Sequence, residues 1–524
     1  MSQSKKAAKS VLIIIIFSLG SKILGFIREM LIAAKFGSGA ETDTFFIALT
    51  AITLFNTMIV NSINTTMIPV LSEIESSEGK IGKRKHTNNL LNIVFIISII
   101  MIILAWLLAP IIIKILATGF EGPQLKMAIL LMRIGLPAII FASVQGVFRG
   151  YLQSESLFIE SAAANFPFNF VYIFFLIFLS GIFGIKGLMV TSVLAIGSQI
   201  ILQIPGIKSV GYRYNAILDF KDKYIKKIIY LIPPVIMSST ISDINNIVDK
   251  SMASNLISGS ISALNYANRL NSLVIGIFIS AITTVLFPTL SKEANKDNYS
   301  GLKRVTISGI NIILLITIPA SIGMMVLAKP IVKLAFERGV FDTTATYMTA
   351  GALLFYAIGL SASAVRTLLY RIFYSLQDTK TPMINSFASL VINIVFNILL
   401  ISYMAHRGLA LATSIASIVS TLFLLFLLKG KIGSFGFSKS IKCGIKSLGA
   451  SITMGIVASL IYNILEKSMG TNGIYEFIIL FISIGLGALL YFIIIYLLKI
   501  DEVNWVIKIA KEKALNSIKK YKKR

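Results

Sequence analysis

The segment TTMIPVLS, residues 65–72, recurs later in the chain as TTVLFPTLS, residues 283–291, with one inserted residue. Four shorter matches recur in the same order, and the separations of the five run from 218 residues (65 to 283) to 228 residues (165 to 393). They are IGL at 134–136 and 358–360, LQ at 152–153 and 376–377, NFPFN at 165–169 with NIVFN at 393–397, and GLMVTS at 187–192 with GLALATS at 408–414. Ordered matches of this kind predict a duplicated architecture.

The repeated segments lie in a chain whose composition is typical of a membrane protein. It is 56% hydrophobic and 14% charged, whereas soluble domains carry about 25% charged residues. Apolar runs of roughly 20 residues, enough to cross a bilayer as a helix, recur throughout. We therefore predict an all-α polytopic membrane protein with about fourteen spans. The predicted spans are 10–34, 44–70, 89–117, 127–149, 158–182, 186–206, 228–251, 260–290, 305–328, 350–374, 383–404, 408–428, 444–465 and 475–498.

The net charge of +26 is distributed as in a membrane protein and does not indicate nucleic-acid binding. Most Lys and Arg lie in connectors on the same side as the N-terminus and in the tail, and this bias predicts that both termini are cytoplasmic. We expect the first apolar stretch to be a retained span rather than a cleaved signal. One Cys and two His leave little basis for disulfides or a histidine metal centre.

Six spans separate the repeated copies, so both halves are expected to insert with the same orientation. We predict two pseudo-symmetric six-helix lobes at residues 1–215 and 216–432, a helix pair at 433–500 and a basic tail at 501–524. Parallel repeats place a substrate site between the halves of a transporter. This organisation favours alternating access over a channel or a membrane enzyme.

Ionisable residues inside spans are functional candidates because each costs about 2.5–3.5 kcal/mol at the bilayer centre. The first span holds Lys22, Arg28 and Glu29, which we expect to line a wet cavity. The alternative is that Lys22 and Glu29 neutralise each other while Arg28 reaches the headgroups. Asp43 opens the second span and is either a gating residue or a helix-start residue at the interface.

The second half carries its own candidates. Asn268 and Arg269 lie in the eighth span, where a lone Arg should face an anionic ligand or a carboxylate from another helix. Together with Lys22 and Arg28, Arg269 predicts a cationic cavity, because Arg binds phosphate through two hydrogen bonds and Lys as a point charge.

Oxygen-bearing side chains form a second group of candidates in this half. Asp249, in the seventh span, should be paired, protonated or bound to a cation. Asn393 and Asn397 share one helical face, and Thr413 follows in the twelfth span. Oxygen ligands of this kind suit a hard cation. Asn and Thr in membranes also commonly just bond neighbouring helices.

Several segments resemble one known family. SKILGFIRE at 21–29, with the TDTFF of 42–46, resembles the opening signature of the MurJ (MviN) lipid II flippases. YANRL at 266–270, FPTLS at 287–291, FYSLQDTKTP at 373–382 and GLALAT at 408–413 resemble further family segments. The similarity covers almost the whole chain, including the final helix pair.

The resemblance implies the fold of the multidrug/oligosaccharidyl-lipid/polysaccharide exporter superfamily and a transporter rather than an enzyme. It implies outward flipping of the undecaprenyl-diphosphate-linked peptidoglycan precursor, lipid II, in the bacterial cytoplasmic membrane. Expected partners are this precursor and membrane lipids, with cell-wall synthesis proteins as candidates. Cavity cations would bind the diphosphate, and Lys22 stands where the family usually has Arg. No cofactor is implied, except for a candidate sodium site at Asp249, Asn393, Asn397 and Thr413.

The sequence also departs from the family pattern. Asn56 replaces a usual Arg, Asn268 a frequent Asp, Ser272 a frequent Glu, and Asn397 a carboxylate of the sodium site. These changes indicate either a divergent lipid II flippase or a paralogue for another lipid-linked saccharide, such as an exopolysaccharide or teichoic-acid precursor. The further alternatives are a cation-coupled drug exporter and a membrane glycosyltransferase or ligase. The last would need catalytic acids in an outer loop, and the loop at 329–349 offers only Glu337 and Asp342.

Overall fold

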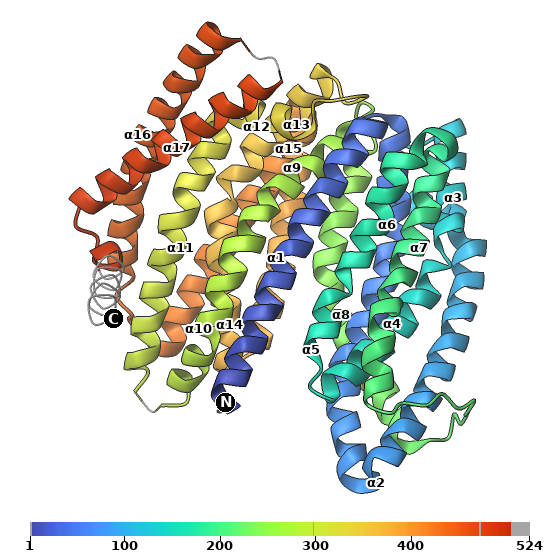
Figure 1. The fold of residues 1–524 in the computed structure, drawn as a ribbon. Coiled ribbons are helices and arrows are strands. Elements are labelled where there is room, and N and C mark those ends of the chain that lie inside the picture. The colour runs from blue at the N-terminus through green and yellow to red at the C-terminus, as the bar shows by residue number, and fades with distance from the viewer. Residues whose placement is uncertain (1–2, 297, 471–472, 505–524) are drawn as a thin grey trace, which may run out of the picture. The chain divides into compact units, whose positions relative to one another are not determined.

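The fold is known from a computed structural model that describes residues 3–296, 298–470 and 473–504. The side chains of 3–16, 162 and 234–242 are not described. Every element assigned within these residues is a helix, which confirms the all-α prediction (Figure 1). The predicted basic tail, 501–524, lies outside the described residues from position 505 onward.

The helices form two compact units. Unit 1 comprises the residues up to Tyr266 together with Phe336–Ala345, and unit 2 comprises Ala267–Ala335 and the residues from Thr346 onward. The division follows packing contacts, whereas the predicted lobes follow the internal repeat. The lobe boundaries therefore stay a prediction.

Unit 1 contains eight complete helices among its described residues, and the start of a ninth, α9 (Ser260–Val274). The complete ones are α1 (Gln3–Phe36), α2 (Ala40–Leu116), α3 (Gly122–Gly135), α4 (Ala138–Ser154), α5 (Phe158–Ala163), α6 (Asn165–Phe178), α7 (Ser180–Ser209) and α8 (Lys223–Ala253). Within this unit α2 packs against α3, α4 and α8, and α6 packs against α1 and α7.

Unit 2 continues from α9 into a short π-helical segment, Ile275–Ile279, and α10 (Ser280–Ala294). The remaining helices are α11 (Ser300–Val326), α12 (Ala328–Phe336), α13 (Thr343–Ile358), α14 (Leu360–Ser375), α15 (Lys380–Ile432), α16 (Phe437–Met469) and α17 (Ile474–Leu497). The ends of α12 and α13 that face each other in sequence belong to unit 1. A core that includes Leu302, Leu368 and Leu424 joins α11, α14 and α15.

Ten helices in the described residues are long and apolar enough to span a membrane, or eleven if the bent pair α13–α14 counts as one span. The chain is therefore a multi-pass membrane protein, while the predicted count of fourteen stays a prediction. Part of the difference has a physical cause. The α2 element, at 77 residues, is far longer than one span and contains a break, yet it counts once.

Three long helices break between predicted spans. In α7 the break is at Gly184, with φ +55°, between the spans predicted at 158–182 and 186–206. In α2 the break is at Gly79, with φ +67°, between the spans predicted at 44–70 and 89–117. In α15 it is at Ala405, with φ +48°, between those at 383–404 and 408–428. Glycine adopts a positive φ with little cost, and L-residues with a side chain rarely do so. Glycine suits the positive φ of the break at position 79. Alanine at position 405 adopts the same kind of φ less readily.

Polar contacts stabilise unit 1 around the α2 break. The buried Lys83 ammonium lies 2.7 Å from a Glu75 oxygen and 2.6 Å from a Glu155 oxygen. Nearby, the His86 ring contacts Glu78 through one nitrogen and Asp222 through the other. A buried charge is stable only when it is paired and hydrogen-bonded, so this cluster fixes the reversal of α2 against α4 and α8.

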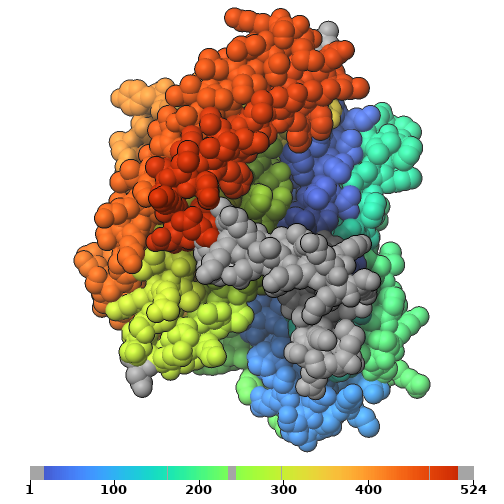
Figure 2. Space-filling model, turned by 60° about the vertical axis from the view of Figure 1, so that its left-hand side comes forward, coloured from blue at the N-terminus to red at the C-terminus, as the bar shows by residue number. Residues whose placement is uncertain are grey.

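The final helix pair, α16 and α17, contacts the other helices of unit 2 at several points. In α12, the Lys333 ammonium lies 3.2 Å from a Glu476 oxygen at the start of α17. The Tyr491 hydroxyl donates to the Leu315 carbonyl of α11 at 2.8 Å. Figure 2 shows α16 and α17 on the surface, in orange and red. Their many exposed apolar side chains, such as Ile456 and Leu489, suit a surface that faces lipid.

The Asp-Thr-Lys-Thr-Pro segment has a clear structural role at the start of α15. The Asp378 carboxylate accepts hydrogen bonds from the Thr381 backbone NH at 2.9 Å and the Thr381 hydroxyl at 2.7 Å. The Lys431 ammonium donates to the same carboxylate at 2.6 Å. Although partial burial raises the pKa of Asp378, these donors outweigh it and lower the pKa to about 2.

Candidate functional site

Arg28 lies at the centre of the candidate site in unit 1. Its guanidinium donates to Glu29 Oε1 at 2.8 Å and to Asn169 Oδ1 at 3.4 Å. It also lies over the rings of Phe168 and Tyr172, at 5.3 and 5.0 Å from their centroids. Hydrogen bonds and cation–π contacts together fix the orientation of the guanidinium.

Asn169 positions this arginine from α6. Its amide nitrogen donates to the Asn165 carbonyl within α6 at 2.9 Å and to the Ser21 carbonyl of α1 at 3.3 Å. The amide oxygen is thereby turned toward Arg28. Asn169 is only 3% exposed and belongs to the NFPFN segment of the internal repeat. Its place in that segment is the sequence signal that could have identified it.

The structure resolves how the charges of α1 are arranged. Arg28 pairs with Glu29, its neighbour in sequence, although consecutive helical residues point about 100° apart. The long Arg side chain bends back to reach the carboxylate, which is nearly buried at 3% exposure. Lys22 is half-buried, six residues and about 9 Å earlier along α1. Unit 1 therefore holds an arginine partly neutralised by a carboxylate, with a second cation on the same helix.

Asp43 lies in the first turn of α2, as the helix-start interpretation predicts, and it also binds a second helix, which neither interpretation includes. It is 3% exposed, and its carboxylate accepts from the backbone NH groups of Gly259 and Ser262 at 2.7 Å each. The Ser262 hydroxyl donates to it as well. These donors form the N-terminal end of α9, where a carboxylate is favoured by the helix dipole. Asp43 thus caps a helix other than its own, while the predicted substrate contact stays a prediction.

Aromatic side chains pack beside this cap. Tyr266 of α9 is fully buried and its hydroxyl donates to the Gly37 carbonyl at 3.1 Å. Its ring contacts those of Phe46, Phe336 and Phe341, at centroid distances of 5.7, 5.0 and 5.6 Å. We call Asp43 and these four aromatic residues the α9 seal. It lies at the end of unit 1 at which α1 meets α2 and links the start of α9 to that turn.

The backbone at the α9 seal is tightly packed. The Val340 NH donates to the Ala34 carbonyl at 2.9 Å. Gly339, with φ +61°, lies so close to Ala34 that a Cβ atom would come within 2.2 Å of the Ala34 carbonyl oxygen. Glycine is required there for both conformation and space.

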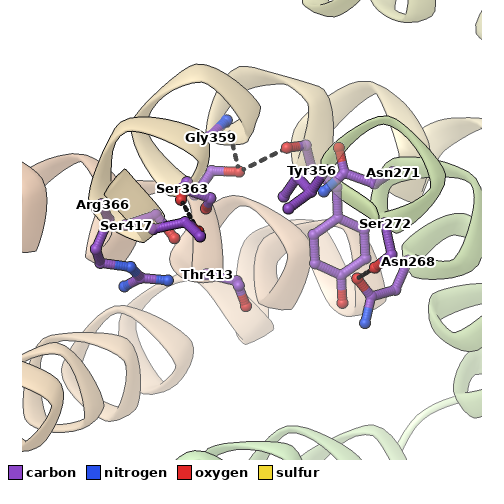
Figure 3. Close-up of a pocket in the computed structure, with 12 residues that line it drawn as sticks. Asn268, Asn271, Ser272, Tyr356, Gly359, Ser363, Arg366, Thr413 and Ser417 are labelled. Carbon is purple, nitrogen blue, oxygen red and sulfur yellow. Dashed lines mark hydrogen bonds between the residues drawn. The ribbon is translucent and has the colours of Figure 1, made fainter. Parts of the chain in front are cut away.

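The predicted headgroup residues of the second half lie on α9 within unit 2. Asn268 accepts a hydrogen bond from the Ser272 hydroxyl at 3.3 Å. Both residues line a cavity of about 240 Å³ (Figure 3). Arg269 is next in sequence and exposed. The role of Asn268 and Arg269 in binding a headgroup stays a prediction.

The candidate sodium ligands of unit 2 form a hydrogen-bonded chain. Asn397 donates to Asn393 Oδ1 at 2.9 Å, Asn393 donates to the Thr413 hydroxyl at 3.2 Å, and that hydroxyl donates to the Leu409 carbonyl at 3.0 Å. Amide nitrogens thus occupy oxygen positions that a cation would need. This series of three hydrogen-bonded side chains contains no carboxylate, because Asn397 carries an amide. Asp249, the predicted carboxylate ligand, belongs to unit 1.

The residues as arranged in unit 2 do not fit sodium. A cation would require the Asn393 and Asn397 amides to turn so that their oxygens converge, which costs the hydrogen bonds just described. In the part of the chain that the structure describes, no group of three or more His, Cys, Asp or Glu side chains could hold a metal ion either. Sodium binding stays a prediction.

The same rule that identified Arg269 should have identified Arg366, an ionisable residue in the middle of the span predicted at 350–374. Its guanidinium donates to the hydroxyls of Ser389 and Ser420 at 3.2 and 3.0 Å. It lines the same cavity as Asn268.

Comparison with known proteins gives a consistent result. A family model described as "Lipid II flippase MurJ" matches residues 32–483. A protein of Buchnera aphidicola subsp. Schizaphis graminum, named "Probable lipid II flippase MurJ", is 28% identical over 512 residues, which cover 96% of this chain and 99% of that protein. A protein of the same name from Vibrio cholerae is 29% identical over 433 residues, covering 80% and 82% of the two chains.

Solved structures agree with the sequence comparisons. Lipid II flippase MurJ in an inward closed conformation is similar with a TM-score of 0.78 and 26% identity, over 93% of this chain and 98% of the other. An inward-facing multidrug resistance transporter of the MATE family and MOP superfamily is similar with a TM-score of 0.67 and 15% identity, over 80% and 98% of the two chains. The second likeness concerns the fold alone.

Proposed function

Because the chain belongs to the MurJ family of lipid II flippases, we infer that it moves lipid II across the membrane by alternating access. It is a transporter and not an enzyme. The observation that carries this conclusion is the family match, which extends over 32–483 and so includes the helices of both units. Peptidoglycan synthesis and cell-wall growth are the processes that such transport serves.

The Arg28 site supplies the chemistry for holding an anionic headgroup. Arginine recognises phosphate through paired hydrogen bonds, and the contacts with Glu29, Asn169 and the two rings hold its guanidinium ready. Lys22 adds a point charge on the same helix. The Glu29 carboxylate reduces the net positive charge, which weakens binding enough for the headgroup to be released after transport.

The α9 seal supplies the closed end that alternating access requires. Asp43 and Tyr266 bind the start of α9 to the α1–α2 turn. For that end of unit 1 to open, the Asp43 hydrogen bonds and the aromatic packing must separate. Water can replace the hydrogen bonds of the Asp43 carboxylate, because a carboxylate hydrates strongly. Exposing the aromatic rings to water is unfavourable. The rings therefore keep this end closed until substrate binding offsets the cost.

The membrane potential provides a direction. With the cell interior negative, moving an anion outward releases about 2.3 kcal/mol per charge per 100 mV, or roughly 4–5 kcal/mol for two charges. We propose that this term drives net outward transport in the bacterial cytoplasmic membrane. The same proposal places both termini in the cytoplasm, following the distribution of Lys and Arg, and makes membrane lipids and cell-wall synthesis proteins the candidate partners.

A second substrate class is favoured by one set of observations. Asn268, Ser272 and Asn397 are neutral where the family pattern often has a carboxylate, which changes the polarity of surfaces that a saccharide or peptide would contact. A different saccharide on the same lipid diphosphate is the alternative consistent with these changes.

The function is tested by two measurements on the full-length chain. The first is translocation of lipid II in proteoliposomes with an imposed potential, where we expect transport that increases as the interior becomes more negative. The second is rescue of a bacterial strain depleted of its own lipid II flippase. Transport of the undecaprenyl-diphosphate lipid without rescue would assign the alternative substrate class. Absence of both would contradict the proposal.

A further inference from the structure

The cavity of about 240 Å³ in unit 2, here called the Arg366 pocket, has a distinctive chemical lining. It is formed by α9, α13, α14 and α15 (Figure 3). Most of its lining residues carry hydroxyl or amide groups: Asn268, Asn271, Ser272, Tyr356, Ser363, Thr367, Thr413, Ser414 and Ser417. Arg366 is the one ionisable cation among the lining residues, and none of them is Asp or Glu.

Arg366 is held in place without being neutralised. One guanidinium nitrogen, Nη1, donates to two serine hydroxyls of α15, at Ser389 and Ser420. No ion pair to Arg366 occurs among the described residues. Figure 3 shows its guanidinium, the Thr413 hydroxyl and the Asn268 amide directed to the same side of the pocket. An arginine inside a membrane protein normally has a counter-charge or a ligand.

The surroundings strengthen this charge imbalance. Thr413 lines the pocket and also accepts from Asn393 in the Asn397–Asn393–Thr413 chain. These three residues are neutral, because amide and hydroxyl side chains carry no charge. Neither the pocket nor the chain beside it offers a negative charge, so the local chemistry opposes a cation and favours an anion.

We propose that the Arg366 pocket is a binding site for a single oxyanion group, a phosphate or a carboxylate. The guanidinium supplies charge and paired donors, while Ser363, Ser417 and the Asn271 amide supply neutral donors. The volume is below the roughly 300–1,000 Å³ of sites for whole drug-sized ligands, which fits one small group. The inference concerns unit 2 alone and does not rest on the proposed transport of lipid II.

The oxyanion has two chemical sources, a free anion such as phosphate or an acidic group of a lipid-linked headgroup. The experiment uses the full-length chain in detergent micelles and equilibrium dialysis with radiolabelled inorganic phosphate. We expect Arg366→Gln to bind one phosphate fewer per chain than the wild type. Arg371→Gln is the matched control, because Arg371 lies on the same helix but is exposed and outside the pocket.

A second variant protects the test from a folding defect. Ser363 precedes Arg366 by three residues on α14, so Ser363→Asp places a carboxylate beside the guanidinium. We expect this variant also to lose one phosphate, and if Arg366→Gln does not fold, it decides the question alone. Unchanged phosphate stoichiometry in the variants that fold would overturn the proposal and leave Arg366 as a structural link between α14 and α15.

A second part of the experiment distinguishes a free anion from a lipid headgroup. Undecaprenyl diphosphate is added to the phosphate-loaded wild type and to Arg371→Gln. Displacement of the phosphate that depends on Arg366 identifies the pocket as a site for a lipid headgroup. Retention of that phosphate identifies it as a site for a free anion. Both outcomes support the oxyanion site and assign its occupant.

Discussion

Arg28 in unit 1 and Arg366 in unit 2 are both arginines inside membrane helices, and they have different neighbours. Arg28 has a carboxylate, Glu29, at 2.8 Å and two aromatic rings. Arg366 has serine hydroxyls and a pocket lined by neutral polar groups. The first is a charge balanced within the protein, whereas the second retains its charge for a ligand.

The difference shows how one residue type serves two purposes. A cation with its own counter-charge binds an anion weakly, because binding must compete with the existing pair. Such a site suits a substrate that is picked up and released. A cation without a counter-charge binds its anion more firmly, which suits a lasting occupant that also stabilises the fold. Four measurements test this contrast.

The largest effect is expected from Arg28→Ala. Loss of the guanidinium removes the anchor for the headgroup and the ion pair with Glu29, at about 2–5 kcal/mol. We expect lipid II translocation in proteoliposomes to fall by a factor of roughly thirty or more. Arg133→Ala is the control, because Arg133 contacts Trp106 instead. Equal translocation by both variants would contradict the assignment of Arg28.

A second variant removes the counter-charge of Arg28, so that this arginine resembles Arg366. Glu29→Gln leaves Arg28 charged without its partner, a change of about 1.5–3 kcal/mol in favour of an anion. We expect inorganic diphosphate to bind this variant roughly tenfold or more tightly in a titration of the purified protein. Glu121→Gln, at an exposed carboxylate, should leave the affinity unchanged. Weaker binding by Glu29→Gln would show that the carboxylate acts mainly by orienting Arg28.

A third variant gives unit 2 a carboxylate that could bind a cation. Asn397→Asp adds a carboxylate beside Asn393 and Thr413, the ligand type that hard cations prefer. We expect sodium to raise the thermal stability of this variant, by about 1.4 kcal/mol at ten times its Kd. Choline at equal ionic strength is the control. If sodium stabilised the wild type equally, the neutral side chains of Asn393, Asn397 and Thr413 would already bind the ion.

The smallest effect is expected at Asp378, where a cation–carboxylate pair lies outside the spans. Asp378→Asn weakens the cap of α15 and the contact with Lys431, at about 0.5–2 kcal/mol. We expect the melting temperature at pH 7 to fall by a few degrees. Asp501→Asn, at an exposed carboxylate, should change it little.

The pH dependence of this effect has a definite sign. The folded protein lowers the pKa of Asp378 to about 2, below the ordinary value of about 3.9. The stabilisation is therefore complete above about pH 4 and is lost as the pH falls toward 2. The difference in melting temperature between wild type and Asp378→Asn should shrink over that window. A difference that persists at pH 2 would mean that the carboxylate charge contributes nothing.

The sequence alone determined the class of the molecule, because apolar length and charge placement are local properties of the chain. Runs of about 20 apolar residues must form helices in lipid, where each backbone group needs an internal partner. The family segments likewise identified a flippase, and the ordered repeats predict a duplicated scaffold. Arg28 and Glu29 are predicted as site residues because charges inside such runs are costly.

Only the tertiary structure decided what those charges contact. The support of Arg28 by Asn169 and the capping of α9 by Asp43 depend on helices brought together by packing. The neutral lining of the Arg366 pocket likewise combines α9 with α13, α14 and α15, which follow much later in the chain. A sequence fixes which residues are costly to bury, but the partners that offset the cost lie on other helices, and their positions follow from the packing of the whole fold.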